Sequence, residues 1–107
     1  MSAFIQAAQE TDIPDPGSML VEVDEHLIVL VHAAGHFYAL DDLCTHDGGP
    51  LSDGHVDAQQ ATLACPRHGA QFDLKTGAAK TMPATKATTS HEVKVENGTV
   101  FVRLNSR

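Results

Sequence analysis

The sequence contains no tryptophan, one tyrosine and four phenylalanines among its 107 residues. Proteins that bind nucleic acid neutralise phosphates with Lys and Arg, and those that bind single strands stack bases on aromatic side chains. Here seven Lys and Arg stand against 14 Asp and Glu, for a formal net charge of −7. This composition argues against nucleic-acid binding and against attraction to anionic membranes. An acidic surface instead favours the approach of basic protein partners.

Long hydrophobic runs are also missing. The longest apolar stretch, residues 27–31, has the length of a strand and falls far short of the roughly 20 residues of a membrane span. The first residues lack a basic segment followed by an apolar one, so no signal peptide is expected. We therefore expect a cytoplasmic protein without membrane association. In a reducing compartment its two cysteines are better candidates for metal ligands or inert thiols than for a disulfide.

The length allows one domain, residues 1–107, with a small core. Alternating apolar residues predict strands at 19–23, 26–31 and 36–40, separated by turn signals, which is typical of an antiparallel sandwich or barrel. Residues 13–17 contain two prolines and are expected to form a loop. Residues 4–8 fit either a strand or a short helix.

The C-terminal part predicts a β-hairpin. Residues 91–96 and 99–104 alternate strictly, and the intervening Asn97-Gly98 is the strongest two-residue hairpin signal. The alternation predicts that four valines line a core face, namely Val93, Val95, Val100 and Val102, with Glu92, Lys94 and Arg103 pointing outward.

The region from about residue 41 to residue 83 has a different composition. It is rich in Gly, Asp, Pro, Cys and His, and only residues 62–64 and 71–73 resemble strands. So long an irregular stretch is unusual in a compact domain. A bound metal would explain how so long an irregular stretch stays folded, because the metal replaces part of the missing core.

Two groups of metal-ligating residue types lie in this region. The first is Cys44-Thr45-His46 and the second is Cys65-Pro66-Arg67-His68, with 18 residues between His46 and Cys65. Each places a thiolate and an imidazole on one short turn. Zinc fingers usually pair Cys with Cys and His with His, whereas each group here mixes the two types. The spacing predicts a metal site and leaves zinc and a two-iron cluster open.

At these residues the sequence closely resembles the Rieske family. Residues 44–51 resemble the first cluster loop, residues 65–73 with the following Lys75-Thr76-Gly77 resemble the second, and Pro83 lies where a third loop shields the cluster. The resemblance implies an all-β fold, in which a Rieske-type antiparallel sandwich or barrel base carries an inserted loop-rich cluster-binding subdomain at about 41–83. It also implies one [2Fe–2S] cluster, whose ligands would be Cys44 and Cys65 on the inner iron and His46 and His68 on the outer iron.

Departures from the family pattern predict a low reduction potential. Gly49 and Arg67 stand where cytochrome bc Rieske proteins have a disulfide, and Ala70 and Phe72 stand where those proteins have Ser and Tyr hydroxyls. Fewer hydrogen bonds to the cluster sulfurs stabilise the reduced state less. We expect a potential near the low end of the Rieske range, roughly −150 mV.

The remaining candidates are given structural roles. Asp53 and Asp73 are expected to cap turns, and the glycines near the ligands to serve backbone geometry. The five other histidines are expected on surfaces or strand faces. Four apolar residues have two possible roles, either as a rim around the exposed histidines or in ordinary packing of the loops: Pro50, Leu51, Pro66 and Pro83.

The chain shows no catalytic motif, so a one-electron carrier is expected rather than an enzyme. The resemblance implies a soluble, monomeric ferredoxin that passes electrons from a flavin-containing reductase to a terminal non-haem iron, ring-hydroxylating oxygenase. Two alternatives remain at this point. One is the small Rieske subunit of an assimilatory nitrite reductase, and the other is a zinc-stabilised binding module.

Overall fold

A computed structural model of the chain describes residues 3–43, 49–66, 69–81 and 87–105. This part of the chain is almost entirely β, and its helical content is a single 3₁₀ turn, η1 (Glu10–Asp12). The strands are β1 (Ile5–Gln9), β2 (Gly17–Val23), β3 (His26–Ala33), β4 (His36–Asp41), β5 (His55–Asp57), β6 (Thr62–Ala64), β7 (Gln71–Asp73), β8 (Ser90–Glu96) and β9 (Thr99–Arg103).

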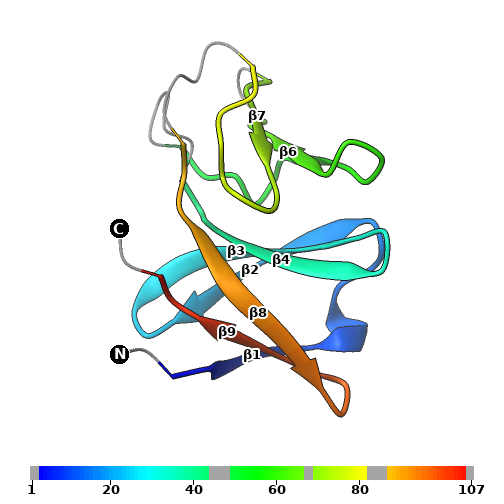
Figure 1. The fold of residues 1–107 in the computed structure, drawn as a ribbon, viewed down its shortest axis with the longest axis vertical. Helices are drawn as coiled ribbons and strands as arrows, with labels where there is room; N and C mark the ends of the chain where they lie inside the picture. The colour runs from blue at the N-terminus through cyan, green and yellow to red at the C-terminus, as the bar shows by residue number, and fades with distance from the viewer. Residues whose placement is uncertain (1–2, 44–48, 67–68, 82–86, 106–107) are drawn as a thin grey trace.

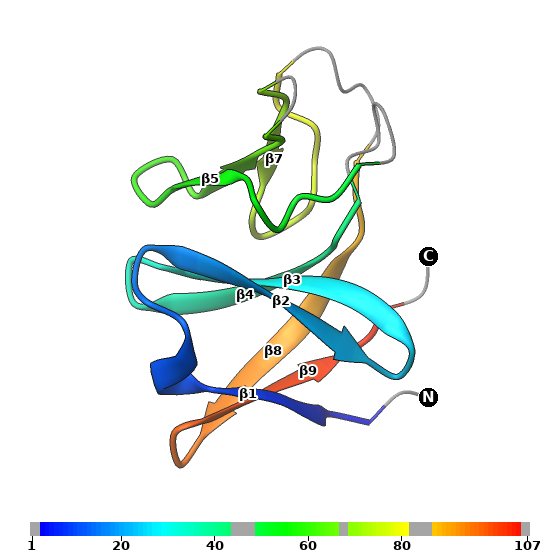
Figure 2. The same ribbon diagram turned by 180° about the vertical axis from the view of Figure 1, so that it is seen from behind.

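The strands form two antiparallel sheets. The larger sheet has six strands in the order β1-β9-β8-β4-β3-β2, and the smaller has three in the order β5-β6-β7. The smaller sheet packs on one face of the larger, at the top of Figure 1 and Figure 2. The edge strands β1 and β2 lie close to each other without a ladder, so the larger sheet curls into a near-barrel. The expected all-β class and antiparallel base are confirmed.

The three predicted N-terminal strands are present and slightly longer than expected. In the β2–β3 hairpin, Val23 pairs with His26, and Asp24 and Glu25 form the turn with φ of 50° and 68°. A short polar side chain such as that of Asp tolerates this left-handed conformation. Residues 5–9 form a strand, which settles the choice between strand and helix near the N-terminus.

The C-terminal hairpin is confirmed, with Asn97 and Gly98 as its turn residues at φ of 51° and 79°. Val100 and Val102 are fully buried and Val93 is partly buried. Val95 is 40% exposed, so its predicted place in the core is wrong. The reason is that β8 pairs with β4 only at Ser90 and His91 and then diverges from it, which leaves Val95 uncovered.

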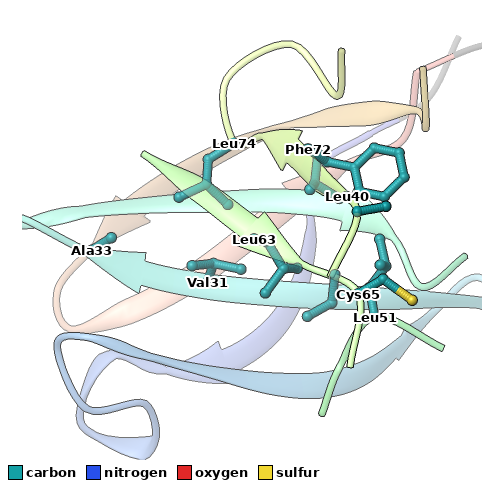
Figure 3. Close-up of a cluster of buried hydrophobic side chains, with 10 residues drawn as sticks. Val31, Ala33, Leu40, Leu51, Leu63, Cys65, Phe72 and Leu74 are labelled. Atoms are coloured by element: carbon teal, nitrogen blue, oxygen red, sulfur yellow. The ribbon is translucent and has the colours of Figure 1, made fainter. Parts of the chain in front are cut away.

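The core consists of two apolar clusters that share β3. Ile28 and Leu30 point into the near-barrel, whereas Val29 and Val31 point toward the smaller sheet. Because β3 is buried on both faces, its sequence is a continuous apolar run rather than an alternation. Figure 3 shows the second cluster, in which β3 and β4 of the larger sheet meet side chains of β6 and β7. No helix in the described residues is long and apolar enough to cross a membrane.

Candidate metal centre

Cys65, the first residue of the second predicted ligand group, lies at the tip of the β6–β7 hairpin. The Cys65 N–H donates a hydrogen bond to the Ala70 carbonyl at 2.7 Å, and the Gly69 N–H donates to the Cys65 carbonyl at 2.9 Å. Gly69 has φ of 72°, a left-handed conformation that glycine adopts without strain. These two bonds close the hairpin directly beyond the three-residue strands. The backbone of Cys65 is therefore held on both sides.

The Cys65 side chain is only 2% exposed and belongs to the apolar cluster between the sheets. It lies at one end of that cluster together with Leu51 (Figure 3). Its thiol forms no disulfide with any residue that the structure describes. A buried, unpaired thiol of this kind either packs as a small hydrophobic group or binds a metal.

The base of the first predicted ligand loop is closed by Asp42. One carboxylate oxygen, Oδ1, accepts hydrogen bonds from the backbone N–H groups of Leu51 and Ser52, each at 2.7 Å. Hydrogen bonds to a charged acceptor are the strong ones in proteins. The residues that begin and end the loop are thus joined through one side chain. Sequence reasoning gave Asp42 no role, because its partners lie nine and ten residues away.

The segment after the second loop folds back along β7. The Lys80 N–H donates to the Gln71 carbonyl at 2.8 Å, and the Gln71 N–H donates to the Thr81 hydroxyl at 2.9 Å. Farther back, Gly77 has φ of 78°, and a Cβ at this position would lie 2.1 Å from the Thr88 carbonyl oxygen. Only glycine fits this crossing, which agrees with the geometric role predicted for Gly77.

Asp73 caps the turn that follows β7, as predicted. One carboxylate oxygen accepts hydrogen bonds from the Lys75 N–H and from the N–H and hydroxyl of Thr76, at 2.9–3.1 Å. Partial burial disfavours the charged carboxylate, but these hydrogen bonds and the nearby Lys80 charge outweigh it, so the pKa of Asp73 lies below its ordinary value. Asp53, the other predicted cap, makes no side-chain hydrogen bond to the described residues.

A buried pair lies where β4 leads toward the first loop. His91 Nε2 lies 2.8 Å from Asp41 Oδ1, and His91 Nδ1 accepts a hydrogen bond from the Asn105 N–H at 3.0 Å. Since a backbone N–H only donates, the ring proton must lie on Nε2 and point to the carboxylate. The pair joins the start of β8 to the end of β4. Sequence reasoning expected His91 on a surface or strand face; it lies on strand β8 and is 7% exposed, so the strand-face alternative holds.

Several predicted site residues lie outside the described part of the chain: Cys44, His46, Gly48, Arg67, His68 and Pro83. Pro50 and Pro66 are exposed, as an apolar rim requires. Leu51 is fully buried, so its proposed place on that rim is wrong and the packing alternative holds. Its side chain packs in the same apolar cluster as Cys65, and its N–H donates a hydrogen bond to Asp42.

The described residues fit a metal cluster in two respects. Cys65 presents a buried thiol at a hairpin tip with a fixed backbone, and Asp42 closes the loop that carries the other predicted group. Within the described ranges no three His, Cys, Asp or Glu side chains gather as a metal-ion site. A centre at Cys65 would therefore draw its other ligands from the remaining segments.

Comparison with known proteins identifies the family. A protein-family model described as the Rieske [2Fe-2S] domain matches residues 3–97. The 3-phenylpropionate/cinnamic acid dioxygenase ferredoxin subunit of Escherichia coli (strain K12) is 37% identical over 100 residues, which cover 94% of this chain and 92% of that protein.

Solved structures agree with this result. The Sphingomonas yanoikuyae B1 ferredoxin superposes with a TM-score of 0.86 at 28% identity, covering 96% of this chain and 100% of its own. A chain of the complex of reduced oxygenase and oxidized ferredoxin in carbazole 1,9a-dioxygenase superposes with a TM-score of 0.85 at 29% identity, covering 94% of this chain and 92% of its own.

Proposed function

The chain belongs to the Rieske [2Fe-2S] family, and we propose that within it the chain is a one-electron carrier, the ferredoxin component of a multicomponent oxygenase system. One [2Fe–2S] cluster is the cofactor of the family. The observation that carries the proposal is the likeness to ferredoxin subunits of dioxygenases over almost the full length of both chains. The carrier itself performs no oxygenation; it delivers electrons to a terminal oxygenase.

The ligands in this proposal are Cys44 and Cys65 on one iron and His46 and His68 on the other. Two neutral imidazoles in place of two thiolates leave the reduced cluster with less negative charge, which raises its potential above that of all-cysteine ferredoxins. The buried thiol of Cys65 supports the assignment of the inner iron to the cysteines. The hydrophobic side chains around Cys65 would exclude water from the inner side of the [2Fe–2S] cluster.

We further propose a flavin-containing reductase as the electron donor and a non-haem iron, ring-hydroxylating oxygenase as the acceptor. Both would act on a monomeric carrier in the cytoplasm. The solved complex of an oxygenase with a similar ferredoxin supports the acceptor class. The net charge of −7 supports protein partners with basic surfaces.

The cofactor is tested by purifying the protein, recording its visible absorption and recording its EPR spectrum after reduction with dithionite. We expect a coloured protein with two iron and two sulfide ions per chain and the EPR signal of a Rieske cluster. A colourless protein that binds one zinc ion tightly would contradict the proposal, because zinc has no redox chemistry.

The carrier role is tested with the reductase and oxygenase components of the 3-phenylpropionate/cinnamic acid dioxygenase system. In place of that system's own ferredoxin, this protein is expected to support substrate oxidation at a lower rate. If dithionite reduces the cluster but no electrons pass from it to the oxygenase, the carrier role is contradicted and only the cofactor assignment stands.

A further inference from the structure

One face of the β2–β3 hairpin continues beyond the smaller sheet that covers it. Val29 and Val31 on this face are fully buried under that sheet. Leu20 pairs with Val29 across the ladder and Leu27 lies two residues before it, so both point to the same side. Yet they are 47% and 55% exposed. We call these two side chains the leucine step.

The leucine step lies beside the closed base of the first predicted ligand loop. The Leu27 carbonyl accepts a hydrogen bond from the Asp42 N–H at 3.1 Å. Asp42 is the residue whose carboxylate joins the two ends of that loop. Leu43, the next residue, is also exposed, at 43%. Leu27 and Leu43 thus lie next to the segment that leads to the proposed cluster.

Acidic side chains lie next to the leucine step. Glu22 lies directly opposite Leu27, and Asp24 and Glu25 form the adjoining turn. All three are exposed, and none forms an ion pair with a described residue. The chain shows the same bias at a larger scale, because residues 1–66 contain eleven of the 14 acids and none of the seven Lys and Arg. The acidic rim is therefore not neutralised by its own hairpin.

We propose that the leucine step and its acidic rim are a docking surface for a redox partner whose apolar contact area is ringed by Lys and Arg. The inference rests on the proposed function, since such docking places the partner beside the cluster loops. Uncovered apolar area supplies the contact, and the carboxylates of the rim orient the partner as it approaches. A second copy of this chain would bring the same carboxylates together, and an anionic membrane would repel them.

Mitochondrial cytochrome c is a suitable probe, because lysines surround its exposed haem edge. Binding is measured by titration calorimetry between the oxidised holoprotein and ferric cytochrome c at low ionic strength, so no electron transfer is required. Neutralising the rim with Glu22→Gln/Glu25→Gln is expected to weaken binding roughly fivefold, and Leu20→Thr/Leu27→Thr roughly threefold to tenfold. Only the first loss should disappear as salt is added.

Matched controls lie at the opposite end of the molecule, near the β8–β9 turn (Figure 1). Glu10→Gln/Glu96→Gln makes the same change in net charge, with Glu96 paired to Lys94 at 2.8 Å. Val95→Thr replaces a methyl group by a hydroxyl on a side chain that is 40% exposed. Both are expected to change the Kd by less than about twofold. Zero-length carbodiimide cross-links to cytochrome c lysines, mapped by mass spectrometry, should fall on Glu22, Asp24 or Glu25.

The inference is overturned if the step variants and the control variants bind equally well. It is also overturned if the parent protein is a dimer that Leu20→Thr/Leu27→Thr dissociates, because the step would then be covered by a second copy. The visible spectrum of every variant shows whether the cluster is bound, which distinguishes failure of the proposed function from failure of the docking surface. A parent protein without a cluster contradicts the proposed function, whereas equal binding by cluster-loaded variants contradicts only the docking surface.

Discussion

The two sheets of this protein are held together in different ways. The larger sheet has strands of five to eight residues, long ladders and a core of its own inside the near-barrel. The strands of the smaller sheet have three residues each and share their core with the larger sheet. Its connections are closed by single side chains, with Asp42 on one side and Asp73 on the other.

The difference shows that the two sheets depend on different interactions for their stability. A long antiparallel ladder with a buried face is stable by itself, whereas a three-residue ladder needs additional contacts. In the smaller sheet those contacts are carboxylate hydrogen bonds, the shared apolar cluster and, in our proposal, the metal cluster. The larger sheet should therefore keep its structure under changes that open the smaller one.

The largest expected effect is that of Cys65→Ser. It removes a proposed ligand at the hairpin tip, and we expect complete loss of the visible absorption of the cluster and of its EPR signal. Without the cluster, amide hydrogen exchange in β6 and β7 should approach that of an open loop, while β3 and β9 keep their protection. A coloured Cys65→Ser protein with an unchanged spectrum would contradict the ligand assignment.

Leu30→Ala tests the larger sheet. Leu30 is fully buried in the near-barrel, so the cavity should lower the free energy of unfolding by about 3 kcal/mol. Urea unfolding followed by far-ultraviolet circular dichroism measures this change. Leu63→Ala removes the same atoms from the cluster under the smaller sheet and should mainly raise exchange in β6 and β7. Equal exchange of all strands in both variants would show that the two sheets open as one unit.

Asp42→Ala tests how the first loop is closed. Two backbone N–H groups lose a charged acceptor at 2.7 Å, which should cost about 2 kcal/mol and loosen the loop. We expect the visible absorption to bleach several-fold faster in the presence of an iron chelator. Ser52→Ala is the control, because the Ser52 hydroxyl lies 3.4 Å from the same carboxylate and contributes little. A bleaching rate equal in both variants would remove Asp42 from the site.

The sequence predicts the local parts of the structure better than the long-range ones. Alternation locates β2, β4, β8 and β9, the apolar run at residues 27–31 locates β3, and Asn97-Gly98 locates the last turn, since all three signals depend on neighbouring residues. Asp73 is identified as a cap because its partners are two and three residues away. The alternation cannot show that β8 leaves β4 after His91, so it places Val95 in the core wrongly.

Contacts between residues far apart in the sequence are also the part of the site that the sequence does not predict. Asp41 meets His91 across 50 positions, and no local pattern distinguishes this histidine from the exposed His36. Asp42 follows Asp41 directly, and only the folded chain shows that one carboxylate binds a loop and the other a histidine. The ligand motif is visible in advance because it is compact, with each pair of candidate ligands on one turn.

The smallest expected effect concerns Asp73 and pH. Its pKa is lowered in the folded protein, so its hydrogen bonds stabilise the fold fully above the ordinary carboxylate pKa of about 3.9. That contribution is lost as the pH falls through this value toward the lower folded pKa. Asp73→Asn should therefore lower the free energy of unfolding by about 1 kcal/mol at pH 6 and by less at pH 4.

Thermal unfolding of the holoprotein at both pH values measures this difference. Asp57→Asn is the matched control, because Asp57 accepts one turn hydrogen bond, from the Gln60 N–H at 3.1 Å, and has no comparable network. A difference between parent and Asp73→Asn that is the same at pH 4 and pH 6 would mean that the charge of Asp73 does not contribute.

The closure of the first loop by Asp42 allows side chains in the loop to change without a change in the backbone frame of the loop. Because the carboxylate binds backbone N–H groups at positions 51 and 52, it holds the ends of the loop whatever side chains the loop carries. Residues between these ends, apart from the proposed ligands Cys44 and His46, can then be exchanged without altering the frame that supports them. A family built on such a frame can vary the surroundings of its redox centre from one carrier to the next while inheriting the fold unchanged.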